Sequence, residues 1–176
     1  DDGETVTLID TGYGARAGDT AGWLPASLAA AGFKPSDIDR VIVTHAHPDH
    51  LYGLTDRSGR PVFPKAQVLI SQPELDFWSK SDAQLREMEA SEHPQFGMVK
   101  TLNQIFQQVE DRLVAIDANH RVSPSIETIA LHGHTPGHIG VKVESEDKRL
   151  LVLADTANHE ILMTVNPRDR AEKVLE

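Results

Sequence analysis

The stretch THAHPDH, residues 44–50, places three imidazoles and a carboxylate within six residues. A hydrophobic core has no need of such a cluster, whereas neutral imidazole is the commonest ligand of divalent metals. The stretch directly follows the β-branched run 39–43, which predicts a buried strand. The histidines therefore come just past the C-terminal end of a strand, where sheet-based sites are usually built.

The spacing of these side chains predicts two neighbouring metal sites. His45 and His47 are two residues apart, so in an extended segment they point the same way and could bind one ion. Asp49 and His50 follow Pro48, which suits the first turn of a helix, and the turn would aim them at a second point nearby. A single ion rarely takes four ligands from six residues. The alternative is an exposed His-rich loop or a tract that scavenges metal.

Two downstream segments could supply the missing ligands. The first is LHGHTPGH, residues 131–138, which follows the alternating strand 126–131. The second is LLVLAD, residues 150–155, an apolar strand that ends in a carboxylate. Such an Asp is usually a loop residue or a helix cap. Here Asp155 gives a third predicted strand that ends in potential metal ligands. Three such strand ends in one chain favour a metal centre.

The motifs resemble those of the metallo-β-lactamase superfamily. That family has His-x-His-x-Asp-His, then a His in a His-Thr-Pro-Gly-His context, then an Asp closing a strand, and all three occur here in this order. The upstream Leu8-Ile9-Asp10-Thr11-Gly12 resembles the family's Asp-Thr-Gly turn. The resemblance covers nearly the whole chain. It implies an α/β fold, the αββα sandwich, with metals at one edge between the two sheets.

The length of 176 residues is typical of one domain. We expect residues 1–176 to form a single metallo-β-lactamase-like domain. The resembled fold usually needs a longer chain, so we also expect the sandwich to be incomplete at both ends.

The resemblance implies two metal sites that share one ligand. Binuclear members use one more His well downstream of the bridging Asp, which we expect in residues beyond this chain. Zn²⁺ suits nitrogen and carboxylate ligands best, although Fe, Mn and Co also fit them. The implied ligands are His45, His47 and His134 at the first site, Asp49 and His50 at the second, and Asp155 as the bridge. His138 is expected to support the site rather than to bind metal.

The implied reaction is hydrolysis. Two metals sharing a hydroxide would provide a nucleophile at neutral pH, because coordination lowers the pKa of water towards about 7. Asp49 is the candidate to orient the nucleophile and to pass a proton. The segments 49–54, 60–64, 74–78 and 154–159 resemble the branch that contains methyl parathion hydrolase and related lactonases. A lactone, an aryl ester or a phosphotriester is therefore the expected small-molecule substrate.

Other activities of the same fold are the alternatives. A β-lactam hydrolase of the type with a Cys ligand is excluded, because the chain has no cysteine. No basic cluster typical of a glutathione thioesterase is evident. Asn158 stands where many acyl-homoserine lactonases carry a Tyr, which counts against that version of lactonase activity. A non-hydrolytic, metal-binding member is the third alternative, but the diiron redox members replace a motif His with Glu, and this chain keeps all three.

Four side chains are candidates for lining the substrate pocket. Tyr52 follows the His-rich motif, where the family usually has a small residue. Phe77 and Trp78 end a helix that we expect to begin at Ser71, and His159 comes shortly after the bridging carboxylate. His159 is too close in sequence to Asp155 to be the last metal ligand.

A helical insert is expected at about 79–113. Glu74 lies three residues after Ser71, the spacing of a capping box that would begin the preceding helix. Within the insert, residues 98–113 carry apolar side chains at helical spacing. This stripe would pack on the sandwich, or form a lid or the face of a homodimer.

Composition excludes several classes of protein. The net charge of −10 argues against a nucleic-acid surface. No apolar run is as long as a membrane helix. We therefore expect a soluble protein. No signal peptide is visible, but the compartment, cytoplasmic or periplasmic in a bacterial cell, stays open because the N-terminus is expected to be missing.

Overall fold

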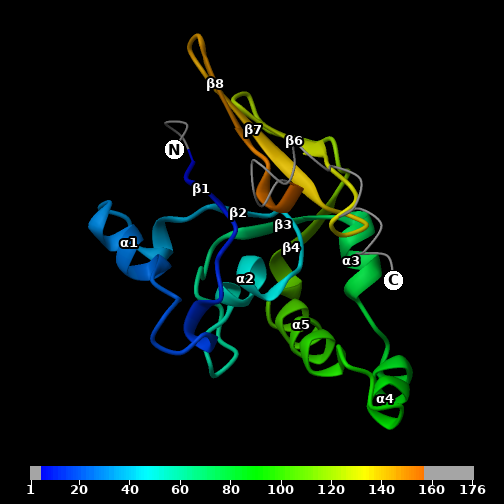
Figure 1. The fold of residues 1–176 in the computed structure, drawn as a ribbon. Coiled ribbons are helices and arrows are strands. Elements are labelled where there is room, and N and C mark those ends of the chain that lie inside the picture. Colours follow the sequence, from blue (N-terminus) through cyan, green and yellow to red (C-terminus); the bar gives the residue numbers. More distant parts are fainter. Residues whose placement is uncertain (1–4, 157–176) are drawn as a thin grey trace.

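The structure, a computed structural model, describes residues 5–156, which form two stacked four-stranded sheets with helices against the first (Figure 1). The first sheet is parallel and its strands follow one another in chain order. The second sheet is antiparallel. The first sheet contains β1 (Thr7–Ile9), β2 (Arg40–Val43), β3 (Gln67–Ser71) and β4 (Leu113–Ile116), and the second contains β5 (Arg121–Ser123), β6 (Ile126–Ala130), β7 (Ile139–Ser145) and β8 (Lys148–Val152).

The order of the first sheet places its helices on one face. Each parallel strand is added on the same side of the previous one, and right-handed crossovers then carry every connection over the same face. The helices are α1 (Leu24–Ala30), α2 (Pro48–Leu51), α3 (Gln72–Trp78), α4 (Asp82–Ala90) and α5 (Phe96–Gln108). In the described residues the layers therefore run helices, first sheet, second sheet, which are three of the four layers of the expected αββα sandwich.

Alternating side chains of the central strands build two cores. In β2, Val41 and Val43 lie in the cluster with the helices, whereas Ile42 lies in the cluster between the sheets. In β3, Leu69 also faces the second sheet, where it meets buried side chains such as Val141 of β7. This period of two is what a strand buried on both faces requires.

The segment expected as a helical insert contains α4 and α5. Helix α5 is part of the crossover between β3 and β4, and its apolar stripe is buried against the first sheet. Leu102 and Ile105 on this stripe are almost completely inaccessible. The expectation that the stripe packs on the sandwich is therefore confirmed. None of the residues of α4 is buried.

The end of the second sheet differs from the expectation. The sequence predicted one strand that runs up to Asp155, but β8 ends at Val152. Ala154 has a φ of 46°, in the left-handed region, and residues Ala154–Thr156 form a short 3-10 turn. The turn brings Asp155 close to His50 and His134.

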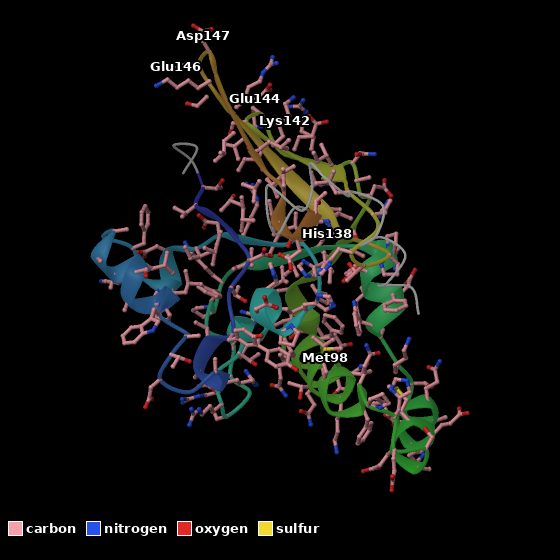
Figure 2. All side chains as sticks on the ribbon, in the orientation of Figure 1. Met98, His138, Lys142, Glu144, Glu146 and Asp147 are labelled. Atoms are coloured by element: carbon pink, nitrogen blue, oxygen red, sulfur yellow. The ribbon has the colours of Figure 1, made fainter. Side chains whose placement is uncertain are left out.

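The β7–β8 hairpin projects beyond the first sheet and carries charged side chains along its length (Figure 2). Glu144 pairs with Lys142 at 3.1 Å and with Arg149 at 2.8 Å. Such exposed pairs contribute little to stability but keep the hairpin well solvated. In the part of the chain that the structure describes, we find no helix with the length and apolar character needed to cross a bilayer.

The buried stripe of α5 allows a test of the packing. Leu102→Ala should lower the free energy of unfolding by about 2–5 kcal/mol, because Leu102 is 0% exposed and its loss leaves a cavity. Leu150→Ala is the matched control, since Leu150 of β8 is 61% exposed, and should change stability by less than about 0.5 kcal/mol. Urea unfolding measures both. Equal effects of the two variants would contradict this packing.

Candidate metal centre

Two loops bring the histidines together. The first, residues 44–50, leaves the C-terminal end of β2, and α2 begins within it at Pro48. The second, residues 131–138, joins β6 to β7. Ile139 donates its backbone N–H to the carbonyl oxygen of Thr44 at 3.0 Å, which joins the two loops directly.

The first cluster consists of three ring nitrogens that face one another. His47 Nδ1 lies 3.1 Å from His45 Nε2 and 2.9 Å from His134 Nε2. The ring planes stand almost perpendicular, at 82° between His45 and His47 and 89° between His47 and His134. Two side chains from one extended segment thus point the same way, as their spacing predicted.

Hydrogen bonds determine which nitrogen of His45 carries its proton. The hydroxyl of Thr44 donates to Asp10 Oδ2 at 2.8 Å, so its oxygen can only accept from His45 Nδ1, which lies 3.1 Å away. The proton is therefore on Nδ1, and Nε2 presents a lone pair to the cluster. Burial, together with the neighbouring histidines, holds the pKa of His45 far below its ordinary value, so the ring is neutral.

The second cluster forms around His50. Its Nδ1 donates to Asp10 Oδ2 at 2.8 Å, and its Nε2 faces Asp155 Oδ1 at 3.3 Å and Asp49 Oδ2 at 3.5 Å. Although burial disfavours a charged ring, the hydrogen bond that His50 donates to Asp10 and the negative charges of Asp10, Asp49 and Asp155 raise the pKa of His50. This corner of the site thus attracts positive charge.

Asp155 lies between the two clusters. One of its oxygens faces His50, and the other lies 3.4 Å from His134 Nε2 and 3.9 Å from His45 Nε2. His138 holds it there, because its Nε2 accepts the backbone N–H of Asp155 at 3.2 Å while its Nδ1 donates to the carbonyl oxygen of Leu131. Both ring nitrogens of His138 are occupied, and Figure 2 shows this residue where the two sheets meet.

The chemistry of these groups suits divalent cations. Lone pairs of three imidazoles and the oxygens of a carboxylate repel one another unless a cation lies between them. The ligand atoms of His45, His47 and His134 all lie within 4.8 Å of one another, and so do those of His45, His50 and Asp155. Nitrogen and carboxylate ligands in this proportion suit Zn²⁺. Asp49 sits at the rim, with its side chain 45% exposed.

Asp10 supports the site in a way that the sequence did not reveal. Its sequence context indicates only the first residue of an Asp-Thr-Gly turn, yet it accepts from Thr44 N, Thr44 Oγ1 and His50 Nδ1, each at 2.8 Å. Its φ of 56° is one that Asp tolerates better than most residues. The available signal was its position directly after β1, whose carboxyl end meets that of β2 in a parallel sheet.

The expected pocket residues occupy different environments. Trp78 is only 4% exposed, and its ring packs edge-on against His47 at 5.8 Å. Phe77 is 46% exposed and lies beside Trp78 at 4.9 Å between ring centroids. Tyr52 packs against the helical core around α5, and burial raises its pKa, partly offset by a hydrogen bond with Thr101. His159, like Asn158, lies outside the described residues.

The sequence model of the metallo-beta-lactamase superfamily matches residues 1–173. The chain belongs to the metallo-β-lactamase superfamily. The family and the fold expected from the sequence motifs are thereby confirmed.

Curated relatives within the metallo-β-lactamase superfamily include two N-acyl homoserine lactonases. The chain is 26% identical over 132 residues to the one from Bacillus cereus and 23% identical over 132 residues to the one from a Bacillus species. Each match covers 75% of this chain and 43% of the relative. The chain therefore spans less than half the length of these relatives.

Solved structures of the superfamily share the fold. AidC, a dizinc quorum-quenching lactonase in complex with a product, has a TM-score of 0.81 at 30% identity, covering 93% of this chain and 57% of AidC. The hydrolase AbOPH has a TM-score of 0.76 at 26% identity, covering 88% of this chain and 53% of AbOPH. The narrower resemblance to the methyl parathion hydrolase branch stays a prediction.

The two clusters predict a metal stoichiometry. Wild-type protein should hold two ions per chain, and His50→Ala should hold one, because only the second cluster contains His50. His132→Ala is the matched control, since His132 is exposed in the same loop as His134 and belongs to neither cluster. Elemental analysis after dialysis counts the ions. If His50→Ala retains both, the division into two clusters is wrong.

Proposed function

We propose that this protein is a binuclear, metal-dependent hydrolase that opens lactone rings, and that it takes N-acyl homoserine lactones without the Tyr that many such lactonases carry, since Asn158 stands at that position. The observation that carries the proposal is the pair of ligand clusters, one around His47 and the other around His50, with one oxygen of Asp155 facing each cluster. The lactonases among the relatives support the choice of substrate. The proposed ligands are His45, His47 and His134 for one ion, Asp49 and His50 for the other, and Asp155 for both.

Zn²⁺ is the proposed metal, in line with the dizinc AidC and with the nitrogen-rich ligands. Divalent ions at such ligands lower the pKa of bound water to about 7 and polarise a carbonyl oxygen. The residues of the chain prepare this chemistry. Asp10 and Thr44 keep the protons of His45 and His50 on Nδ1, so that both Nε2 atoms stay free to bind.

Asp49 is the proposed proton carrier. Its carboxylate is half exposed at the rim of the site, with one oxygen 3.5 Å from His50 Nε2. In lactone hydrolysis, water attacks the carbonyl carbon, the ring C–O bond breaks, and the departing alkoxide needs a proton. A carboxylate that reaches both the second cluster and solvent can take the proton of the attacking water and return it to the leaving oxygen.

Phe77 is the proposed contact for an acyl chain. It is the exposed member of an aromatic pair whose other member, Trp78, lies against His47. The exposed ring therefore offers apolar surface that is separated from His47 by one aromatic side chain. Trp78 itself is too deeply buried to offer such surface and instead supports the His47 ring.

A substrate panel tests the proposed reaction. The purified protein loaded with Zn²⁺ should cleave N-hexanoyl homoserine lactone with a higher kcat/KM than an aryl acetate, a phosphotriester, a β-lactam or a glutathione thioester. Rates come from product formation with each substrate at matched metal content. A β-lactam or thioester cleaved far faster than every lactone would overturn the proposal, whereas preference for the phosphotriester would favour the methyl parathion hydrolase resemblance.

The role of Phe77 predicts a chain-length effect. Phe77→Ala should raise KM for N-hexanoyl homoserine lactone about fivefold, corresponding to about 1 kcal/mol of lost apolar contact. The same variant should leave the hydrolysis of γ-butyrolactone unchanged, because that substrate has no acyl chain. Steady-state kinetics with both substrates measure the difference. An equal rise for both would show that Phe77 acts on the site itself and not on the acyl chain.

A further inference from the structure

Glu74 is a carboxyl group that the proposed reaction does not use, although it is 0% exposed and lies next to the metal centre. Its sequence position predicted a capping box with Ser71, and only half of that box forms. Ser71 Oγ accepts the backbone N–H of Glu74 at 3.3 Å. The Glu74 side chain turns away from the helix terminus and reaches between the two histidine loops.

The two oxygens of Glu74 hold different loops. Oε1 accepts the backbone N–H of Ala46, the residue between the first two histidines, at 2.8 Å, and also the indole N–H of Trp78 at 2.8 Å. Oε2 accepts the hydroxyl of Thr135, the residue after His134, at 2.7 Å, and the backbone N–H of Gly137 at 3.0 Å. One carboxylate thus links both halves of the first cluster.

The backbone of the second loop lies directly on the first turn of α3. A Cβ at Gly137 would fall 2.1 Å from Glu74 N and 2.5 Å from Glu74 Cα, so only glycine fits. Ser71 Oγ also donates to the carbonyl oxygen of Gly137. The first turn of α3 therefore serves as the surface against which the loop of His134 is placed.

We propose that Glu74 is a positioning residue that sets the separation of the His45–His47 pair from His134, and thereby the affinity of the first cluster for its ion. The inference rests on the proposed metal centre. All four partners of Glu74 are donors, and a carboxylate offers acceptors on both oxygens. An amide at this position offers one oxygen, and its NH₂ group would face either two N–H donors or the Gly137 N–H and a hydroxyl that can turn to accept, so at least one hydrogen bond is lost.

Glu74→Gln tests this requirement. The variant should bind its first Co²⁺ about 10- to 100-fold more weakly than wild type in competition with a chelator, the usual range for residues that orient metal ligands. Its Co²⁺ absorption spectrum should shift as well, because the relative placement of His47 and His134 changes. Neither readout depends on enzymatic activity.

Two further variants separate positioning from stability. Thr135→Val keeps the shape of the side chain and removes one of the four hydrogen bonds, so it should fold and show a smaller loss of Co²⁺ affinity. Asn103→Ala is the matched control. Asn103 is a buried polar residue that holds α5 to Trp78 O and Lys80 N without touching either histidine loop. It should lower stability and leave Co²⁺ affinity and spectrum unchanged.

The outcomes are distinct. Wild-type affinity and spectrum in both Glu74→Gln and Thr135→Val would overturn the positioning role while leaving the metal centre intact. The same loss of Co²⁺ affinity in Asn103→Ala would also overturn it, because the effect would then follow from stability. If Glu74→Gln does not fold, the Co²⁺ affinity and spectrum of Thr135→Val test the positioning role. A wild-type protein that binds no Co²⁺ overturns the proposed function, and this inference with it.

Discussion

The carboxylate of Asp10 is the constraint on which the site depends. It accepts from the Thr44 hydroxyl and from His50 Nδ1, and so fixes the protonation of two imidazoles at once. Without that choice of tautomer, His45 and His50 could each turn an N–H towards the centre, and a metal would meet a proton instead of a lone pair. The hydrogen bonds at Nδ1 therefore determine that Nε2 is the nitrogen available to bind a metal.

The sheet topology explains why one carboxylate can do this. The carboxyl ends of β1 and β2 lie side by side in a parallel sheet, so Asp10 comes to rest beside Thr44 although 34 residues separate them. Two backbone hydrogen bonds also connect these segments: the N–H of Asp10 donates to Ile42 O, and the N–H of Thr11 donates to His50 O. The second loop arrives from the other sheet and is placed by α3. The site is thus formed by the carboxyl edge of the first sheet on one side and, on the other, by the loop 131–138, which packs on α3.

The sequence predicted the parts of the site that depend on local spacing. His45 and His47 converge because an extended segment points alternate residues the same way, and the apolar stripe of α5 is buried because its spacing is helical. Contacts between distant segments were harder to predict. The position of Glu74 indicated a local cap, yet its side chain bonds to residues 28 and 63 positions away. Trp78 was expected to line the pocket, but it is buried against His47, whereas Tyr52 is partly buried beside the helical core.

The position of Asp155 between the two clusters affects how strongly the two sheets are held to each other. Residues 44–50 follow a strand of the first sheet, while His134 and Asp155 follow strands of the second, so an ion bound at this candidate centre would crosslink two separately hydrogen-bonded layers. Because the ion binds the assembled layers and not the separated ones, its binding free energy adds to their cohesion. Between the sheets the buried contact is a small cluster around Ile42 and Ile139. An ion held by residues of both sheets would thus stabilise the contact between the two layers in addition to any chemical role.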